Sequence, residues 1–266
     1  MEKGITIGVF GGSGFYDFLS DAKELDVKTP YGSPSDKVIV GSYKGKKVAF
    51  LPRHGKKHQY PPHKIPYLAN ILAFKSLGVR RIIAPCAVGS LKKKIKPGDF
   101  VVCDQIINFS AGRRDTFYDG PKTAHVSLAD PYCPDLRKIS CGECEKSGAK
   151  THKKGTMVVI NGPRFSTKAE SLFFSKAGDI INMTAYPEAV LAREQGMCYL
   201  NVALVTDYDA GLSGSPNVKA VTTEEVAEIF RKNNERIKKA LFNIIEKASG
   251  NQTCDCSSHI KRAFFK

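Results

Sequence analysis

The chain has 266 residues, 42% of them hydrophobic, which is enough for one large domain with a substantial core. Its 41 Lys plus Arg outnumber 26 Asp plus Glu, giving a formal net charge of +15. The basic residues are mostly scattered lysines, so we interpret them as a solvated surface and expect no nucleic-acid partner. Because no apolar segment approaches the length of a membrane span, we also expect no membrane partner and a cytoplasmic location.

The first predicted element is a strand over residues 5–10, followed by a glycine-rich turn over residues 11–14. Such a turn lets backbone N–H groups and the Ser13 hydroxyl approach an anion closely. It is not a Walker loop, and Asp17 occupies the last glycine position of a dinucleotide fingerprint. The turn therefore predicts a phosphate cradle of another kind.

A hairpin is predicted next, with strands over residues 38–43 and 47–51 around a Lys-Gly-Lys turn. It delivers Arg53 and His54 at its far end. An arginine offers a planar fork of donors and the histidine one more, a combination that suits a tetrahedral oxyanion. Their place at a strand end favours this function over two surface charges.

The middle of the chain alternates helix and strand. Apolar spacing predicts a helix over residues 67–77 and a strand over 81–85, followed by a second small-residue turn at Cys86 and Ala87. A further strand is expected over residues 100–109. Residues 110–130 show no helical period but hold His125, and a polar loop of that length in a compact domain is usually functional.

Residues 161–188 combine an aromatic, Phe165, with a helix-length segment and a short apolar strand at 180–181. Met183, Thr184 and Glu188 follow that strand, where ligands of α/β sheets bind, so they suggest pocket lining. Alternatively, Met183 fills a gap in the core and Glu188 favours the first turn of the next helix. The residues alone leave both interpretations open.

The last predicted elements are a strand over residues 196–207, which leads into Asp207 and Asp209, and a long amphipathic helix over residues 226–245 capped by Thr223. Alternating strands and helices predict an α/β fold with a mostly parallel sheet. We expect a catalytic domain over residues 1–248 and a C-terminal tail over 249–266.

Eight cysteines include a CxxC at Cys141 and Cys144 and a CxC at Cys254 and Cys256. A zinc site needs four converging thiolates or imidazoles, and CxC is not the usual spacing. Disulfides are the other possibility. They are rare in the cytosol of mesophiles but occur inside hyperthermophiles, with which a lysine-rich composition is compatible.

Seven motifs occur in order: GGSGF, PRHG, AVGSL, FYDG, NGPRFS, NMTAYPE and TDYD. Together they resemble the methylthioadenosine phosphorylases of the trimeric purine nucleoside phosphorylase family, and the resemblance extends through about Asp209. It implies a single α/β domain with a twisted, partly barrel-like mixed sheet flanked by helices, in place of the parallel sheet expected above.

The resemblance also implies phosphorolysis, in which phosphate attacks the anomeric carbon of 5'-methylthioadenosine and releases adenine and 5-methylthioribose 1-phosphate. Phosphate is a co-substrate, and neither a cofactor nor a metal is expected in the site. Positive charge should develop on the ribosyl ring and negative charge on the departing purine. The enzyme would contribute positioning and electrostatic stabilisation.

Residue by residue, the matching motifs imply two sets of contacts. The phosphate set is Ser13, Arg53, His54, Cys86, Ala87 and Thr184. The nucleoside set is Phe165, Met183, His125, Asp207 and Asp209, with Asp207 as the proton donor to the purine. Because His125 corresponds to a residue that such trimers lend to the neighbouring subunit, a homotrimer or a hexamer of two trimers is implied.

Two segments depart from eukaryotic members of the family. After TDYD the chain reads AGLSGSPNV where those enzymes carry a bulky aromatic, and the CxC tail resembles archaeal members instead. For a hyperthermophilic host we expect a Cys133–Cys198 disulfide, with Cys141 and Cys144 joining the two tail cysteines in further bonds.

Two other functions remain open at this point. Within the family, the alternative is a 6-oxopurine enzyme acting on methylthioinosine, inosine or guanosine. From a different class, the positive charge would allow a nucleic-acid-binding protein with Arg53 among its phosphate contacts.

Overall fold

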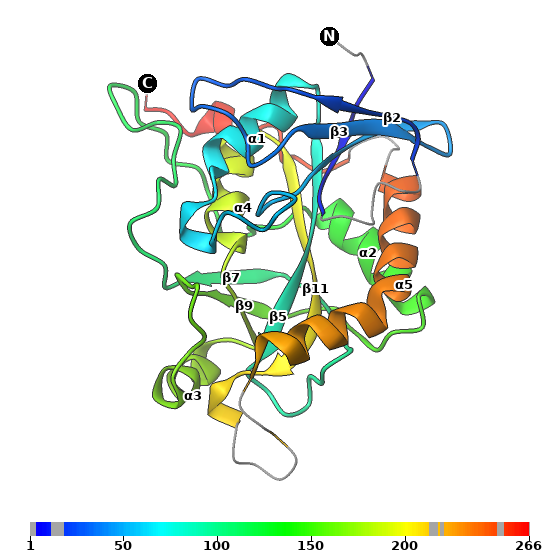
Figure 1. Cartoon of the computed structure of the whole chain (residues 1–266). Helices are drawn as coiled ribbons and strands as arrows, with labels where there is room; N and C mark the ends of the chain where they lie inside the picture. The colour runs from blue at the N-terminus through cyan, green and yellow to red at the C-terminus, as the bar shows by residue number, and fades with distance from the viewer. Residues whose placement is uncertain (1–3, 12–18, 213–217, 219–220, 249–252, 266) are drawn as a thin grey trace.

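The computed structural model describes residues 4–11, 19–212, 218, 221–248 and 253–265. In this part of the chain, eleven strands form one mixed sheet, in which β5 and β11 are the longest strands and cross the centre (Figure 1). The strands are β1 Ile7–Phe10, β2 Ser20–Leu25, β3 Val38–Tyr43, β4 Lys46–Leu51, β5 Arg81–Ser90, β6 Phe100–Val102, β7 Gln105–Asn108, β8 Thr151–His152, β9 Thr156–Val159, β10 Ile180–Asn182 and β11 Cys198–Tyr208.

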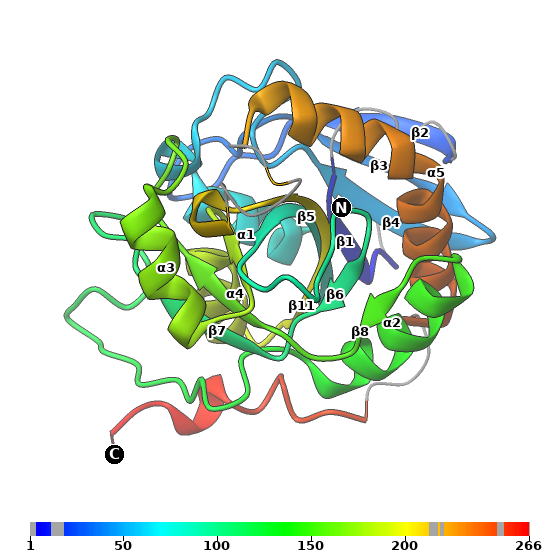
Figure 2. The same ribbon diagram turned by 90° about the horizontal axis from the view of Figure 1, so that it is seen from below.

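Helices cover both faces of this sheet, which Figure 2 shows curling around β5 and β11. The α-helices are α1 Tyr67–Ser76, α2 Pro134–Lys146, α3 Lys168–Ala177, α4 Ala185–Glu194 and α5 Thr223–Ala248, and the short 3-10 helices are η2 Pro62–Lys64, η3 Ala210–Leu212 and η4 Ile260–Arg262. One apolar core lies between the sheet and α1 with α4, and a second lies between the sheet and α2 with α5. None of the described helices has both the length and the apolar character of a bilayer span.

The central strand β5 explains why the sheet is mixed. It pairs in parallel with β1 and with β11, but antiparallel with β10. The mixed sheet implied by the family resemblance is therefore confirmed. Among the described strands most pairs are parallel, as strand–helix alternation predicts, but antiparallel pairs also occur. The turn predicted at Cys86 is wrong, because β5 continues to Ser90 with β10 and β11 as its hydrogen-bonding neighbours.

Most local predictions are confirmed. The hairpin of β3 and β4 turns through Lys44 and Gly45, both with positive φ, and α1 stops just before Gly78, whose φ is +91°. The single strand expected over residues 100–109 is instead two strands, β6 and β7. The cap of α5 is Thr222 rather than Thr223, since the Thr222 hydroxyl accepts a hydrogen bond from the Glu225 N–H at 3.2 Å.

Strands β2 and β8, helix α2 and the short 3-10 helices were not predicted. Strand β2 is exposed along nearly its whole length, so it shows no alternation of apolar and polar residues, and β8 has only two residues. Helix α2 begins with Pro134 at its first position and Asp135 in its first turn, and it buries Leu136 and Cys144. These are ordinary start signals of a helix.

The C-terminal tail packs against the domain. The Asp135 carboxylate accepts hydrogen bonds from the backbone N–H groups of Thr253 and Cys254 and from the Thr253 hydroxyl, at 2.8–2.9 Å. Farther along, the N–H of His125 donates to the Ala263 carbonyl at 2.8 Å. The tail therefore bridges the start of α2 and the long loop before it.

The grouping predicted for the cysteines is wrong. Four sulfurs lie within 4.8 Å of one another, and we call this group the tail cluster: Cys133, Cys198, Cys254 and Cys256. The CxxC cysteines of α2 are not part of it. Cys133 and Cys198 come together as expected, but the structure contains no disulfide bond among its described residues.

Candidate active site

A buried ion pair lies where β4, β5 and α4 meet. Arg53 follows β4, and its guanidinium donates through Nε and Nη2 to the two carboxylate oxygens of Glu188, at 3.0 Å for Nη2–Oε2. Tyr199 donates its hydroxyl to the same carboxylate at 2.8 Å. Arg53 is 8% exposed and Glu188 is not exposed at all, so each charge is compensated almost entirely by its partners.

The same guanidinium also contacts β5. Its Nη1 donates to the Pro85 carbonyl at 3.3 Å, and it lies over the Phe10 ring at 5.0 Å. Burial acts to lower the pKa of Arg53, but the Glu188 carboxylate overrides it and raises the pKa above its ordinary value. Of its five N–H donors, two have no acceptor in the described part of the chain, so they can still bind an anion.

His54 has one ring nitrogen already committed. Its Nδ1 lies 2.8 Å from the Tyr60 carbonyl oxygen, and a carbonyl can only accept, so Nδ1 carries the proton. Burial, with Arg53 nearby, lowers the pKa of His54 to about 4. At neutral pH the ring is therefore uncharged and Nε2 is an acceptor. The expectation of a second donor is corrected: His54 can accept a hydrogen bond from a hydrogenphosphate hydroxyl.

The turn between β10 and α4 is organised by Asn182, which sequence reasoning did not identify. Its Oδ1 accepts hydrogen bonds from the N–H groups of Thr184 and Ala185, at 2.6 and 2.9 Å. Its Nδ2 donates to the Ala87 carbonyl at 3.1 Å. Asn182 therefore links two predicted phosphate residues, Ala87 on β5 and Thr184 before α4, through one side chain.

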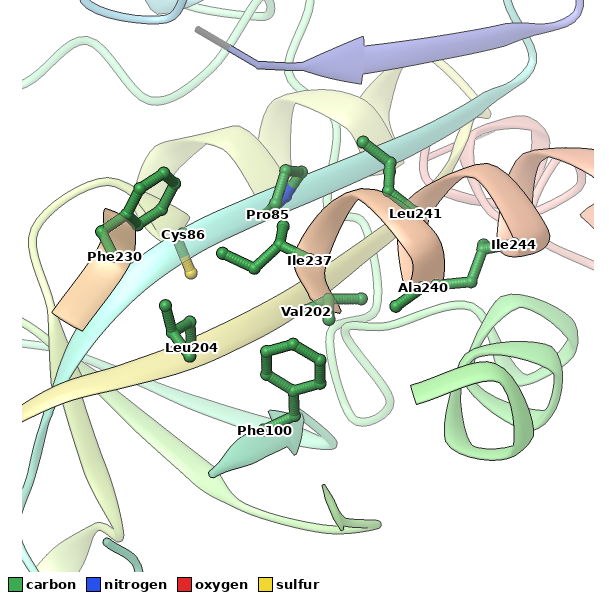
Figure 3. Close-up of a pocket in the computed structure, with 10 residues that line it drawn as sticks. All are labelled: Pro85, Cys86, Phe100, Val202, Leu204, Phe230, Ile237, Ala240, Leu241 and Ile244. Carbon is green, nitrogen blue, oxygen red and sulfur yellow. The ribbon is translucent and has the colours of Figure 1, made fainter. Parts of the chain in front are cut away.

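Cys86 occupies the same strand but borders an apolar cavity. Burial raises the pKa of its thiol to about 12, so it stays protonated at neutral pH. Figure 3 shows it among apolar residues of β5, β6, β11 and α5 that line this cavity, which has a volume of about 10 Å³. A space of that size holds about one water at most, so it is a packing gap and not a substrate pocket.

The carboxyl end of β11 carries the two predicted aspartates. A register shift between Val205 and Asp207 leaves Thr206 unpaired in the β5–β11 register and places Asp207 opposite Gly89. Thr206 donates to Asp207 Oδ2 at 2.8 Å. Burial outweighs this hydrogen bond and, together with Asp209, raises the pKa of Asp207 from its ordinary 3.8 to about 6.

Asp209 is more deeply buried, at 3% exposure. Its N–H donates to the Ser90 carbonyl at 3.0 Å, which fixes its backbone to the end of β5. Burial raises its pKa as well. Within the described residues, its Oδ2 has no hydrogen-bond partner. A buried carboxylate oxygen in this state is an acceptor available to a ligand donor.

Two further predicted contacts come from the segment between β9 and α4. Gly162 adopts a φ of +62°, and a Cβ there would lie 2.5 Å from Met183 Sδ, so the Asn-Gly-Pro turn packs directly on Met183. Phe165 is 38% exposed and stands just before the capping box of α3, formed by Thr167 and Glu170. The aromatic ring is therefore partly open to a planar ligand.

Of the remaining predicted residues, one is not described and the other contacts a different part of the chain. Ser13 lies outside the described residues. His125 contacts the C-terminal tail, with its ring 5.2 Å from that of Phe265. The structure adds Asn182 and Gly89, which lie in the NMTAYPE and AVGSL motifs. It also pairs Glu188, which the sequence suggested as pocket lining, with Arg53.

The raised pKa of Asp207 predicts a pH-dependent stability. The folded state disfavours the ionised carboxyl, so wild type should lose stability relative to Asp207→Asn as pH rises from about 4 to about 6. After discounting for solvent screening, we expect the difference in unfolding free energy to grow by about 1 kcal/mol between pH 4.5 and 7.5. Urea unfolding measures it, with the exposed Asp26→Asn as control. A pH-independent difference would contradict the assignment.

Comparison with known proteins places this geometry in context. Residues 6–246 match the family model described as the phosphorylase superfamily. The chain is 50% identical over 266 residues to the S-methyl-5'-thioadenosine phosphorylase of Thermofilum pendens, covering 99% of each chain. It is 48% identical over 258 residues to the protein of that name from Pyrococcus abyssi, covering 97% of this chain and 98% of the relative.

Solved structures agree with these sequence matches. A methylthioadenosine phosphorylase from an antarctic soil metagenomic library superposes with a TM-score of 0.93 at 38% identity, covering 99% of this chain and 93% of that one. The Schistosoma mansoni methylthioadenosine phosphorylase in complex with adenine gives a TM-score of 0.90 at 33% identity, covering 98% and 99%. The likeness therefore extends over almost the whole chain in sequence and in structure.

Proposed function

Because the chain belongs to the phosphorylase superfamily, we propose that it cleaves S-methyl-5'-thioadenosine with phosphate, yielding adenine and 5-methylthioribose 1-phosphate. One observation carries the choice of base. At the end of β11, Asp207 has a pKa of about 6, and the neighbouring Asp209 presents a buried oxygen without a partner in the described chain. A protonated carboxyl beside an acceptor complements a 6-aminopurine, whose edge offers the N7 acceptor and an amino donor.

The two halves of the site perform different tasks in this mechanism. Asp207 donates its proton to N7 as negative charge develops on the departing purine, and Asp209 accepts a hydrogen bond from the amino group. The remaining Arg53 donors and the Thr184 hydroxyl hold phosphate, and His54 Nε2 accepts a hydrogen bond from a phosphate hydroxyl. Met183 lies beneath the ribose and Phe165 stacks on the purine. No covalent intermediate and no cofactor beyond phosphate is required.

In our proposal, Cys86 and Ala87 also contact phosphate. They do so through the backbone of β5 and not through the Cys86 thiol. The thiol is protonated and faces apolar neighbours, so it is a poor anion ligand. The backbone position is held from two sides, by Arg53 on the Pro85 carbonyl and by Asn182 on the Ala87 carbonyl. Ser13 would complete the set.

We further propose that the chain works as a homotrimer, or as a hexamer of two trimers. Three large apolar side chains at the end of β7 and on α3 are exposed: Phe109 at 43%, Leu172 at 55% and Phe173 at 58%. The rings of Phe109 and Phe173 lie 5.9 Å apart and form part of one patch. Such a patch supports an interface between subunits, to which His125 would contribute. Light scattering on the purified protein measures the assembly. The cytoplasmic location stays a prediction.

The experiment that tests the function is a phosphate-dependent cleavage assay on methylthioadenosine, adenosine, inosine and methylthioinosine. We expect methylthioadenosine to give the highest kcat/KM and no cleavage without phosphate. Faster cleavage of inosine or methylthioinosine would replace the proposal by the 6-oxopurine function. Duplex DNA binding at moderate salt, with no nucleoside cleavage, would favour the nucleic-acid alternative.

A variant of Gly89 tests the placement of Asp207. A Cβ at Gly89 would lie 2.9 Å from Asp207 Oδ1 and 3.0 Å from Ile181 Cγ2, so the carboxyl must shift. Because a misplacement of about 1 Å can cost about a hundredfold in rate, Gly89→Ala should lower kcat by roughly that factor. Gly142→Ala is the control, since a Cβ there meets nothing within 4 Å. Unchanged kcat in Gly89→Ala would remove Asp207 from the proton transfer.

A further inference from the structure

The tail cluster contains none of the residues proposed for the active site. Cys133 immediately precedes α2, Cys198 begins β11, and Cys254 and Cys256 belong to the C-terminal tail. Cys133, Cys198 and Cys256 are each no more than 1% exposed. Four sulfurs from three separate segments therefore converge in the protein interior, which packing alone does not require.

The distances in the tail cluster fit a tetrahedral ion. Cys254 Sγ lies 3.5 Å from Cys133 Sγ and 3.4 Å from Cys198 Sγ, and all four sulfurs are within 4.8 Å of one another. Zinc binds thiolate sulfur at about 2.3 Å in tetrahedral sites, which puts neighbouring sulfurs about 3.8 Å apart. A disulfide would need about 2.05 Å. The spacing in the structure is therefore that of ligands around a common centre.

Backbone hydrogen bonds hold three of the four ligands in place independently of their sulfurs. The Cys133 N–H donates to the Tyr199 carbonyl at 3.0 Å, and the Cys198 N–H donates to the Arg80 carbonyl at 2.9 Å. Asp135 fixes the tail through the Cys254 N–H at 2.9 Å. Ligands that are preorganised in this way lose little conformational freedom when they bind a metal ion.

The electrostatics of the tail cluster also favour a cation. Cys133 precedes the N-terminus of α2, where the helix dipole favours negative charge. Four thiolates in contact within a buried space would repel one another, and a bound cation offsets that repulsion.

We infer that the tail cluster binds one zinc ion through four thiolates and thereby fastens the C-terminal tail to α2 and β11. Soft thiolate ligands select Zn²⁺ over hard cations, and four protein ligands close the coordination shell, as in structural sites. Binding releases the thiol protons to solvent without any oxidation. The ion has no open position and takes no part in the phosphorolysis.

The test begins with the metal content of the full chain purified in the presence of reductant. Elemental analysis should find about one zinc per chain, released by an organomercurial that blocks thiolates. In Cys256→Ser the zinc should be lost, whereas Cys141→Ser, a partly exposed cysteine of α2 outside the tail cluster, should keep it. Cys256→His should also retain metal, because imidazole is a zinc ligand.

A second measurement does not depend on how well the variants fold. The wild-type chain, refolded with Co²⁺, should show the intense sulfur-to-cobalt charge-transfer absorption of a tetrathiolate site, and zinc should displace it. Thiol titration of the denatured, unreduced protein tests whether the cysteines form disulfides instead. Fewer than eight thiols without stoichiometric zinc would overturn the inference in favour of disulfides. Eight thiols with no zinc and no cobalt absorption would overturn it as well.

Discussion

Replacing Asp207 with Asn is expected to lower kcat/KM for methylthioadenosine by at least about a hundredfold while activity on inosine is retained or increased. The loss follows because an amide can donate a hydrogen bond to N7 but cannot transfer a proton to it, and general acid catalysis contributes about 10²–10⁴-fold. The gain follows because a 6-oxopurine presents two acceptors, with which an ionised Asp207 clashes and an amide does not. A buried polar mismatch discriminates more strongly than apolar fit.

The measurement for Asp207→Asn is a comparison of kcat/KM for methylthioadenosine and inosine at saturating phosphate. The KM for phosphate is its internal control, since Asp207 lies on the base side of the site and that value should not change. An equal loss on both nucleosides would show that Asp207 does not select the base. A wild-type preference for inosine would refute the aminopurine assignment before any variant is made.

Replacing Arg53 with Ala should raise the KM for phosphate by at least about tenfold, with a smaller effect on the KM for the nucleoside. A desolvated oxyanion would lose a charge-assisted partner, which typically costs about 2–5 kcal/mol. The variant should also be less stable by about 3–5 kcal/mol, because Glu188 is left buried without its cation. Initial rates against phosphate and urea unfolding measure the two effects separately.

The double variant Arg53→Ala/Glu188→Gln separates those two roles of Arg53. A neutral glutamine still accepts the hydrogen bond from Tyr199 and leaves no buried charge, so much of the lost stability should return. The KM for phosphate should stay high, because the donors of Arg53 are still missing. A double variant with normal phosphate dependence would restrict Arg53 to a structural role.

Much of the fold could be predicted because its signals are local. The β3–β4 hairpin was evident from its turn residues, and α1 from its apolar spacing and the glycine that ends it. The errors arise where the secondary structure depends on pairing with segments that are distant in sequence. The small residues from Cys86 to Ser90 resemble a turn, but β10 and β11 pair with them and extend the strand. No local pattern contains that information.

In the candidate site, too, local sequence signals identify some residues, whereas contacts between distant segments could not be predicted. Arg53, Thr184 and Asp207 stand out through residue type at strand ends, but the partner of Arg53 lies 135 residues away in sequence. Whether His54 donates or accepts a hydrogen bond at Nε2 depends on the Tyr60 carbonyl, which no motif indicates. The CxxC of α2 attracted attention through its spacing, whereas the cysteines that actually converge come from three separate segments.

Strand β11 has a cysteine of the tail cluster at its first residue and Asp207 near its last. Nine residue steps separate Cys198 from Asp207, or roughly 30 Å along an extended strand. In directed evolution, base selectivity and thermal stability can therefore be changed independently, by substitutions at opposite ends of β11. A starting variant that is stabilised near Cys198 would tolerate destabilising substitutions near Asp207 that change the substrate preference.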